Sequence, residues 1–342
     1  MKIGIVGYQG SGKSTLFEWL TGAKPDLSIA HIGQSAMSVV PEPRVAKMCE
    51  IYKPKKITLA SLEVVDTPGL NRAHEGNAQK LAVIREAGCL VLVVAGFSKG
   101  DPLEDQRGFA EDALLADMEI VGGRIERLRE STKKPRPNRD QELAELAALE
   151  TVLAALEKGQ PLKASEMSED QLKATRSFRL LSEKPVLVLV NAADDDNDLD
   201  RYGDKTAEGT PLVAVRVGLE LELERMSPED RVEFEKEMGM SGSRKDLVLR
   251  RMLDVSNQML YFTAGEKEVR TWMLRRGGTA LEAAENIHSD LARGFIRAET
   301  MAADDLIRLG SERDMKAQGL VRQEPKDYVL KDCDVINIKF SV

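Results

Sequence analysis

The sequence predicts an α/β fold: a doubly wound sheet with an inserted helical hairpin and a smaller C-terminal domain. In the first half, short apolar runs rich in β-branched residues alternate with helix-like segments. This alternation stops between residues 109 and 183, and a new pattern of short strands begins near residue 258. A chain of 342 residues is long enough for about two domains.

Five strands are expected in the main sheet, and each is a nearly continuous apolar run, as in a parallel sheet covered on both faces. They are Lys2–Gly7, Ser61–Asp66, Cys89–Ala95, Pro185–Asn191 and Leu212–Val217. Sheets of this kind bind ligands at the carboxyl ends of their strands. We therefore expect the functional residues to follow these ends.

The middle segment carries two runs of apolar residues spaced by three and four, which is the heptad pattern of paired helices. The runs are Leu114, Met118, Val121, Ile125 and Leu128, and then Leu146, Leu149, Leu153 and Leu156. The turn between them, residues 133–139, holds four basic residues, Lys133, Lys134, Arg136 and Arg139. An antiparallel hairpin is predicted, whose basic tip is either a solvated turn or an RNA contact.

Composition indicates a cytoplasmic protein. The net charge of −8 argues against binding nucleic acid with the whole surface, and no DNA partner is expected. The three cysteines are widely spaced and match no disulfide or zinc pattern, which favours a reducing compartment. Neither a signal peptide nor an apolar run of about 18 residues is apparent, so we expect no membrane partner.

The segment Gly7–Ser14 matches the phosphate-binding pattern G-x-x-x-x-G-K-S and follows an apolar strand, which is the context this motif needs. Its glycines let backbone N–H groups point at phosphate oxygens. Lys13 would reach the β- and γ-phosphates, and the Ser14 hydroxyl would bind Mg²⁺. The nucleotide-binding residues expected here are Gly7, Gln9, Gly10, Ser11, Gly12, Lys13, Ser14 and Thr15.

A second metal anchor is expected in the Asp66-Thr67-Pro68-Gly69 segment, directly after an apolar strand. Asp66 would hold Mg²⁺ through water, and the Gly69 N–H would meet the γ-phosphate. The next residue is Leu70, where many GTPases carry a water-orienting glutamine. His74 is then a candidate for that role, and the expected catalytic residues are Lys13, Gly69 and His74.

Base recognition is expected in Asn191-Ala192-Ala193-Asp194, where a guanine-binding N-K-x-D motif would stand. Asn191 can bond the purine edge, and Asp194 could accept from guanine N1 and N2. The lysine that packs over the base in that motif is replaced by Ala192. The choice between ATP and GTP stays open on these residues.

With these motifs, the chain resembles the YchF-type (Obg-like) ATPase family of the translation-factor GTPase class. The strongest resemblance is C-terminal and lies in Tyr261–Gly265, Glu268–Arg270, Gly294–Glu299, Lys326–Val329 and Asp332–Val335. It implies a P-loop NTPase that associates with ribosomes and prefers ATP. It also implies a C-terminal TGS domain, a ubiquitin-like β-grasp module. The expected domains are a nucleotide-binding (G) domain (1–108 and 184–257), a helical coiled-coil insertion (109–183) and the TGS domain (258–342).

The chain departs from the family pattern at several positions. Gly10 stands where an asparagine is usual, and Asp194 stands where the family has glutamate. By correspondence with the family's fifth base-binding loop, Arg216 and Val217 are expected at the nucleotide. In the segment that corresponds to the family's first switch loop, Ser28 or Ser35 is expected to supply a hydroxyl for the metal. Three readings remain: a slow ATPase or GTPase acting on the ribosome, a GTP-specific GTPase, or a nucleotide-gated RNA-binding scaffold with negligible turnover. A metabolic kinase is disfavoured, because no acceptor-substrate motif is visible.

Overall fold

The computed structural model describes residues 1–29, 31–73, 76–98, 101–159, 162, 166–238 and 242–341. Two compact units make up the chain: Met1–Ala36 with Glu63–Arg244, and Met37–Leu62 with Lys245–Val342. The first unit includes the helical insertion. The second includes the segment 37–62, which sequence order alone had assigned to the nucleotide-binding domain.

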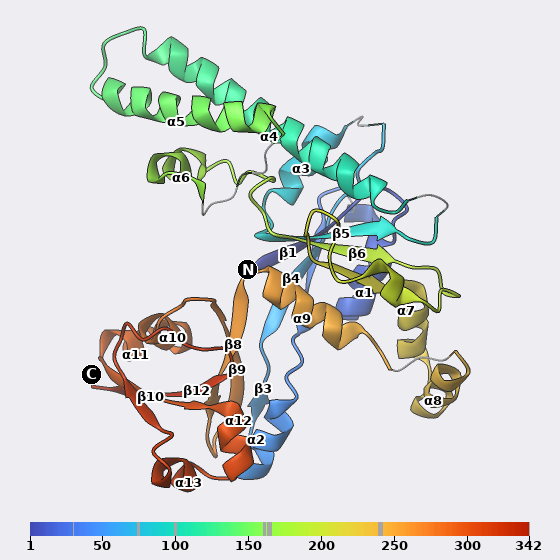
Figure 1. The fold of residues 1–342 in the computed structure, drawn as a ribbon, viewed down its shortest axis with the longest axis vertical. Helices are drawn as coiled ribbons and strands as arrows, with labels where there is room; N and C mark the ends of the chain where they lie inside the picture. Colours follow the sequence, from blue (N-terminus) through green and yellow to red (C-terminus); the bar gives the residue numbers. More distant parts are fainter. Residues whose placement is uncertain are drawn as a thin grey trace. The chain divides into compact units, whose positions relative to one another are not determined.

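The first unit is built on a six-stranded sheet of order β2-β4-β1-β5-β6-β7 (Figure 1). Its strands are β1 (Lys2–Val6), β2 (Gln34–Val39), β4 (Ser61–Asp66), β5 (Cys89–Ala95), β6 (Val186–Asn191) and β7 (Leu212–Val215). The predicted fold class is confirmed, since β1, β4, β5, β6 and β7 pair in parallel. Strand β2 was not expected. It lies at the sheet's edge, where half of its residues are exposed and no continuous apolar run marks it.

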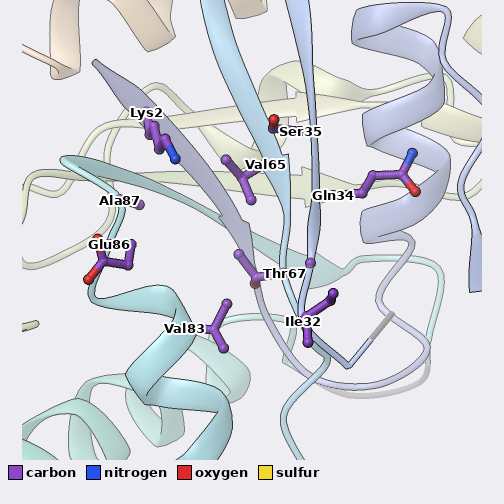
Figure 2. A pocket seen from close by; sticks show the side chains of 10 residues that line it. Lys2, Ile32, Gln34, Ser35, Val65, Thr67, Val83, Glu86 and Ala87 are labelled. Atoms are coloured by element: carbon purple, nitrogen blue, oxygen red, sulfur yellow. The ribbon is translucent and has the colours of Figure 1, made fainter. Parts of the chain in front are cut away.

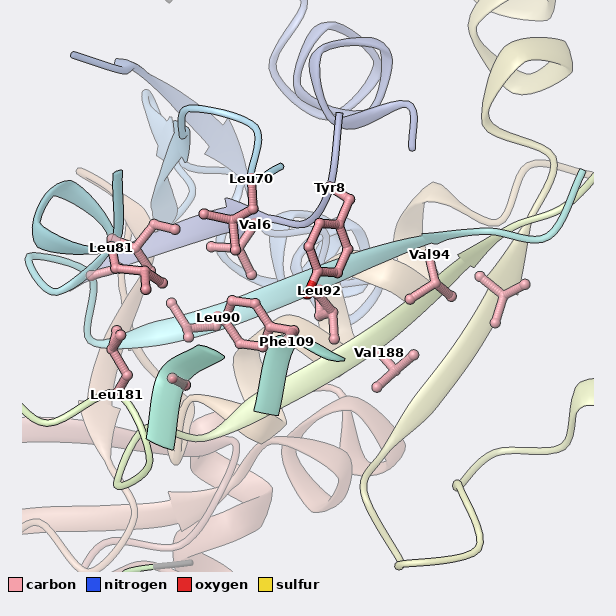
Figure 3. Packing of buried hydrophobic residues seen from close by; sticks show 14 of the residues in the cluster. Val6, Tyr8, Leu70, Leu81, Leu90, Leu92, Val94, Phe109, Leu181 and Val188 are labelled. Atoms are coloured by element: carbon pink, nitrogen blue, oxygen red, sulfur yellow. The ribbon is translucent and has the colours of Figure 1, made fainter. Parts of the chain in front are cut away.

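The carboxyl ends of β1, β4 and β6 meet at one edge of this sheet. In the register, Ile5 lies opposite Asp66, and Ala95 lies opposite Asn191. Side chains of β1, β5, β6 and the helix α4 bury a shared apolar cluster beneath that edge. Figure 3 shows Leu70 and Tyr8 packed in this cluster next to Val6. The loops that follow β1 and β4 are thus fixed to the core by their own side chains.

Helices of the first unit are α1 (Lys13–Thr21), α3 (Asn77–Ile84), α4 (Glu104–Ser131), α5 (Arg139–Glu157), α6 (Glu169–Thr175), α7 (Val217–Arg225) and α8 (Pro228–Glu237). Short 3₁₀ turns η1 (Leu27–Ile29) and η3 (Leu199–Tyr202) complete it. Among the described residues, no helix combines the length and apolar character needed to cross a membrane.

Helices α4 and α5 form the predicted antiparallel hairpin (Figure 1). The expected heptad positions meet in one cluster, in which Val121, Ile125, Leu128 and Leu149 are almost completely buried. Helix α4 begins at Glu104, five residues before the expected start of the insertion, and so contributes its first turns to the core of the sheet domain through Phe109.

A buried carboxylate fastens the base of this hairpin. Asp117 on α4 is fully buried and forms an ion pair with Arg85, its Oδ1 lying 2.6 Å from Nη1. It also accepts the backbone N–H groups of Leu181 and Ser182, at 3.0 and 2.8 Å, and the Ser182 hydroxyl. Because a buried charge is stable only when paired and hydrogen-bonded, this arrangement holds α4 in a single position against α3.

The second unit contains a mixed sheet of order β11-β10-β12-β8-β9-β3. Its elements are α2 (Arg44–Tyr52), β3 (Ile57–Thr58), α9 (Lys245–Val255), β8 (Gln258–Ala264), β9 (Val269–Arg275), α10 (Ala280–Ile287), α11 (Ser289–Arg293), β10 (Phe295–Ala302), α12 (Ala303–Leu309), α13 (Glu312–Ala317), β11 (Arg322–Glu324) and β12 (Asp334–Phe340). Strands β8 and β12 pair in parallel at its centre, and α10 packs its alanines on one face. This is the expected β-grasp arrangement.

The opposite face of the β8–β9 hairpin is covered by α2 from the segment 37–62, through Val45 and Met48. Strand β3 extends the same sheet by pairing with β9. Glu42, whose side chain is fully buried, pairs with both Arg44 and Arg250. Burial of apolar surface and this ion cluster therefore join the segment 37–62 to the C-terminal strands.

Candidate nucleotide-binding site

The loop Gly7–Gly12 connects β1 to α1 and turns through three glycines with positive φ. A Cβ on Gly7 would lie 2.5 Å from the Val93 carbonyl oxygen, and one on Gly12 would lie 2.2 Å from Asn191 Nδ2. Both positions therefore require glycine for space as well as for backbone conformation. The loop is thus held close to β5 and to the end of β6.

Lys13 begins α1, and its side chain returns across the loop. Its Nζ donates a hydrogen bond to the Tyr8 carbonyl oxygen at 2.8 Å, and the residue is buried. Burial lowers the pKa of Lys13 to about 8, although the nearby Asp66 carboxylate acts in the opposite direction. A Cβ on Gly69 would lie 3.0 Å from Lys13 Nζ, so the structure places Gly69 beside this ammonium.

Ser14 and Asp66 meet as the metal-site prediction requires. Ser14 Oγ donates to Asp66 Oδ2 at 2.7 Å, while Asp66 Oδ1 is buried and has no hydrogen-bond partner among the described residues. Burial raises the pKa of Asp66, and the contacts with Ser14 and Lys13 counteract that rise. A hydroxyl and a carboxylate with an unused buried oxygen are the donor types that Mg²⁺ takes beside phosphates, so these residues fit the ion.

Asn191, at the end of β6, links three segments. Its Nδ2 donates to the Ser11 carbonyl oxygen at 3.1 Å, and its Oδ1 accepts the Val217 N–H at 3.3 Å. Asp194 is exposed, and its Oδ1 accepts the Leu219 N–H at 3.1 Å, within the first turn of α7. Arg216 is buried and donates to Asn197 Oδ1 at 3.2 Å. The residues expected around the base therefore lie together, next to the phosphate loop.

The other residues expected at the site differ in where the structure places them. Gln9 is exposed on the phosphate loop, Thr15 lies in α1, and His74 lies outside the described residues. Ser28 Oγ donates to Asp26 in an exposed turn. Ser35 lines a cavity of about 230 Å³ between β2, β4 and α3 (Figure 2), which no residue of the phosphate loop lines. Leu70 is completely buried in the apolar cluster, so its side chain faces away from the nucleotide site.

A polar network around Tyr8 was not expected from the sequence. The Tyr8 hydroxyl donates to Asp112 Oδ2 on α4 at 3.0 Å, and Asn77 Nδ2 donates to the same oxygen at 3.1 Å. In the loop after Gly69, the Asn71 N–H donates to Asn77 Oδ1, and Asn77 Nδ2 donates to the Asn71 carbonyl oxygen. Burial and the Asp112 charge raise the pKa of Tyr8. Tyr8 occupies a variable position of the motif, and Asp112 lies 104 residues away, so no local pattern marks the pair.

These features define a P-loop nucleoside-triphosphate-binding protein of the G-domain class. Residues 2–121 match the family described as 50S ribosome-binding GTPase, and residues 259–341 match the YchF GTPase C-terminal family, described as "Protein of unknown function (DUF933)". The chain belongs to the YchF family, as the resemblance implied.

Full-length relatives support this membership. The "Ribosome-binding ATPase YchF" of Haemophilus influenzae is 34% identical, over 100% of this chain and 99% of its own. The protein of the same name from Bacillus subtilis is 33% identical, over 99% of both chains. The solved structure of the Schizosaccharomyces pombe YchF GTPase has a TM-score of 0.83 and 28% identity, and the match covers 99% of this chain and 97% of that one.

The lowered pKa of Lys13 predicts a pH dependence of nucleotide binding. The ammonium form binds phosphates, so affinity is constant well below pH 8 and falls by up to about tenfold per pH unit above it. Phosphate contact raises the pKa of Lys13 again, so binding takes up a proton at alkaline pH. Titration calorimetry in buffers of different ionisation enthalpy measures this uptake, which is near zero at pH 6.5 and larger at pH 9. Equal uptake at both pH values, or the same rise in Lys13→Arg, would contradict the assignment.

Proposed function

We propose that this protein is a cytoplasmic, ribosome-associated switch that binds ATP or GTP with Mg²⁺ and hydrolyses it slowly. One observation carries the proposal: the Lys13 ammonium, the Ser14–Asp66 contact and the Asn191 amide converge at the carboxyl edge of one sheet. Relatives that match over their full length are named ribosome-binding ATPases, and the matched N-terminal family is described as a ribosome-binding GTPase.

Each residue has a separate task in this proposal. Backbone N–H groups of the phosphate loop and the Lys13 ammonium bind the β- and γ-phosphates, and the Gly69 N–H contacts the γ-phosphate. Ser14 Oγ, and Asp66 through water, would hold Mg²⁺, which would neutralise charge on the phosphates. Asn191 fixes the base loop against the phosphate loop, so that base and phosphate contacts form together.

The buried position of Leu70 favours a second candidate, a nucleotide-gated scaffold with negligible turnover. A leucine in the apolar cluster cannot orient water, and rotation toward the site would expose it. The two candidates predict the same nucleotide binding and differ in the rate of hydrolysis.

Replacing Lys13 by Ala tests the site directly. Loss of the charge on the phosphates weakens nucleotide binding at least tenfold, about 1.4 kcal/mol or more. Calorimetry measures the affinity, and phosphate release with and without ribosomes measures the turnover. Unchanged affinity in Lys13→Ala would refute the phosphate site, whereas normal affinity with no phosphate release from the wild type would select the scaffold.

For the base, we expect ATP to bind at least as well as GTP. The Asp194 carboxylate already accepts the Leu219 N–H, and Ala192 offers no long side chain to cover a guanine. Competition with labelled ATP and GTP measures the ratio of affinities. A GTP affinity more than tenfold tighter than that for ATP would reverse this expectation. Asp194→Asn should then abolish the preference, while its exposed neighbour changed by Asp195→Asn should retain it.

The hairpin tip is the proposed RNA contact. Lys134 and Arg136 are exposed there and line an open hollow of about 550 Å³, whereas Lys133 pairs with Glu130 and Arg139 bonds the Thr132 carbonyl oxygen. Acidic neighbours such as Glu126 line the same hollow. The tip is therefore a mixed surface, on which Lys134 and Arg136 form no ion pair with the described residues.

Ribosome binding through this tip should weaken with salt, by a log–log slope of roughly −0.9 per phosphate contact if the RNA behaves like duplex DNA. Replacing all four basic residues of the tip by Ala should flatten this slope in cosedimentation and leave nucleotide affinity unchanged. As a control matched in the number of charges removed, a second variant replaces four exposed cations of the C-terminal unit by Ala: Arg308, Arg313, Lys316 and Lys326. If the second variant loses the salt dependence and the first retains it, the C-terminal unit is the contact surface.

A further inference from the structure

Arg72 lies against the phosphate loop, although it belongs to the loop between β4 and α3. Its guanidinium carbon is 5.3 Å from the centre of the Tyr8 ring. Its Nη1 lies 3.4 Å from the Gln9 carbonyl oxygen, at the edge of hydrogen-bond distance. Arg72 follows Gly69, whose N–H we assign to the γ-phosphate, by three residues. A permanent cation therefore lies beside the proposed site without belonging to the phosphate-binding motif.

One carboxylate holds Arg72 in this position. Its Nε and Nη2 donate to the two oxygens of Asp105, at 2.9 and 2.7 Å, in a bidentate pair. Asp105 lies in the first turn of α4, at the start of the helical hairpin. The Arg72 side chain is 55% exposed, whereas that of Asp105 is 15% exposed. Solvent screens the pair from the guanidinium side, so Arg72 can exchange Asp105 for a more highly charged partner.

Arg72 lies close to the phosphate-binding lysine. Lys13 Nζ donates to the Tyr8 carbonyl oxygen at 2.8 Å, and Arg72 Nη1 lies 3.4 Å from the carbonyl oxygen of the next residue, Gln9. The two cations therefore lie at neighbouring backbone carbonyls of the loop. A triphosphate between them would be attracted by both, because its charge exceeds that of the single Asp105 carboxylate.

We propose that Arg72 is an internal catalytic arginine, which leaves Asp105 and contacts the γ-phosphate oxygens as the phosphoryl group is transferred. This inference rests on the proposed function. In the reaction, water oxygen forms a bond to the γ-phosphorus, and the bond from that phosphorus to the β–γ bridging oxygen breaks. The electron pair stays on the β-phosphate, giving the nucleoside diphosphate. The water's protons pass to inorganic phosphate and solvent. Arg72 stabilises charge on the γ-phosphate oxygens and exchanges no proton.

In this proposal, the ion pair with Asp105 keeps Arg72 away from the phosphates. While the pair is intact, Arg72 is directed toward α4. When the pair opens, its planar fork becomes available for phosphate oxygens, to which it can bind through two N–H groups. Because Asp105 lies on the hairpin, a partner that displaces the first turn of α4 would release Arg72 and raise the rate of hydrolysis.

Three variants test this inference by single-turnover hydrolysis, together with the affinities for the diphosphate and for a non-hydrolysable triphosphate. Arg72→Ala should lower the hydrolysis rate at least tenfold and leave diphosphate affinity within about twofold. Arg72→Lys should give an intermediate rate, because lysine retains the charge without the fork. Asp105→Asn should match or exceed the wild-type rate. Arg107→Ala is the control, since Arg107 on α4 pairs with Asp101 just before that helix, through an exposed contact, and its removal should change nothing.

The outcomes separate this inference from the proposed function. Wild-type turnover no greater than that of Lys13→Ala would refute hydrolysis itself, and the catalytic role of Arg72 with it. Wild-type turnover that persists in Arg72→Ala would overturn the role of Arg72 alone. An equal loss of rate in Arg72→Ala and Asp105→Asn would overturn it too, because the pair would then act only by holding the loop. Thermal unfolding of each variant checks that the fold is retained.

Discussion

Parallel pairing of β1 with β4 on one side and β5 on the other is the constraint on which the nucleotide site depends. The register that places Ile5 opposite Asp66 brings the Asp66 carboxylate to the loop that β1 leads into. The pairing of β5 with β6 brings Asn191 to the same edge. A slip of one residue would exchange the two faces of each strand and disrupt the packing on both, so burial of the apolar strands also maintains the geometry of the site.

Close packing at this edge explains why residue types are so restricted there. Asn191 reaches the Ser11 carbonyl oxygen only because Gly12 has no Cβ, and the same amide accepts the N–H of Val217. The phosphate loop, the base loop and α7 are thus joined through one side chain. A site connected in this way is pre-organised before nucleotide arrives, which reduces the ordering cost of binding.

The loop after Asp66 connects this rigid edge to the helical hairpin. Leu70 anchors it in the core, Asn77 joins it to Asp112, and Arg72 joins it to Asp105. Both carboxylates lie on α4, whose base is fixed by the buried Asp117. The loop that we propose contacts the γ-phosphate therefore shares side-chain contacts with the start of the hairpin. Such sharing is the physical requirement for nucleotide and a hairpin-bound partner to influence each other.

The sequence by itself determined the five parallel strands, the heptad-paired helices and the residues from Gly7 to Ser14, with Asp66 and Asn191. These were predictable because buried parallel strands need continuous apolar runs, and phosphate chemistry needs particular residues directly after them. Only the tertiary structure decided the edge strand β2, the packing of residues 37–62 with the C-terminal strands, and the network from Tyr8 and Arg72 to α4. Strand β2 has no continuous apolar run, and the other features depend on partners far apart in the chain, such as Thr58 with Glu268, 210 positions away. A contact formed by folding over that separation leaves no periodicity or motif at either residue, so no local pattern could have revealed it.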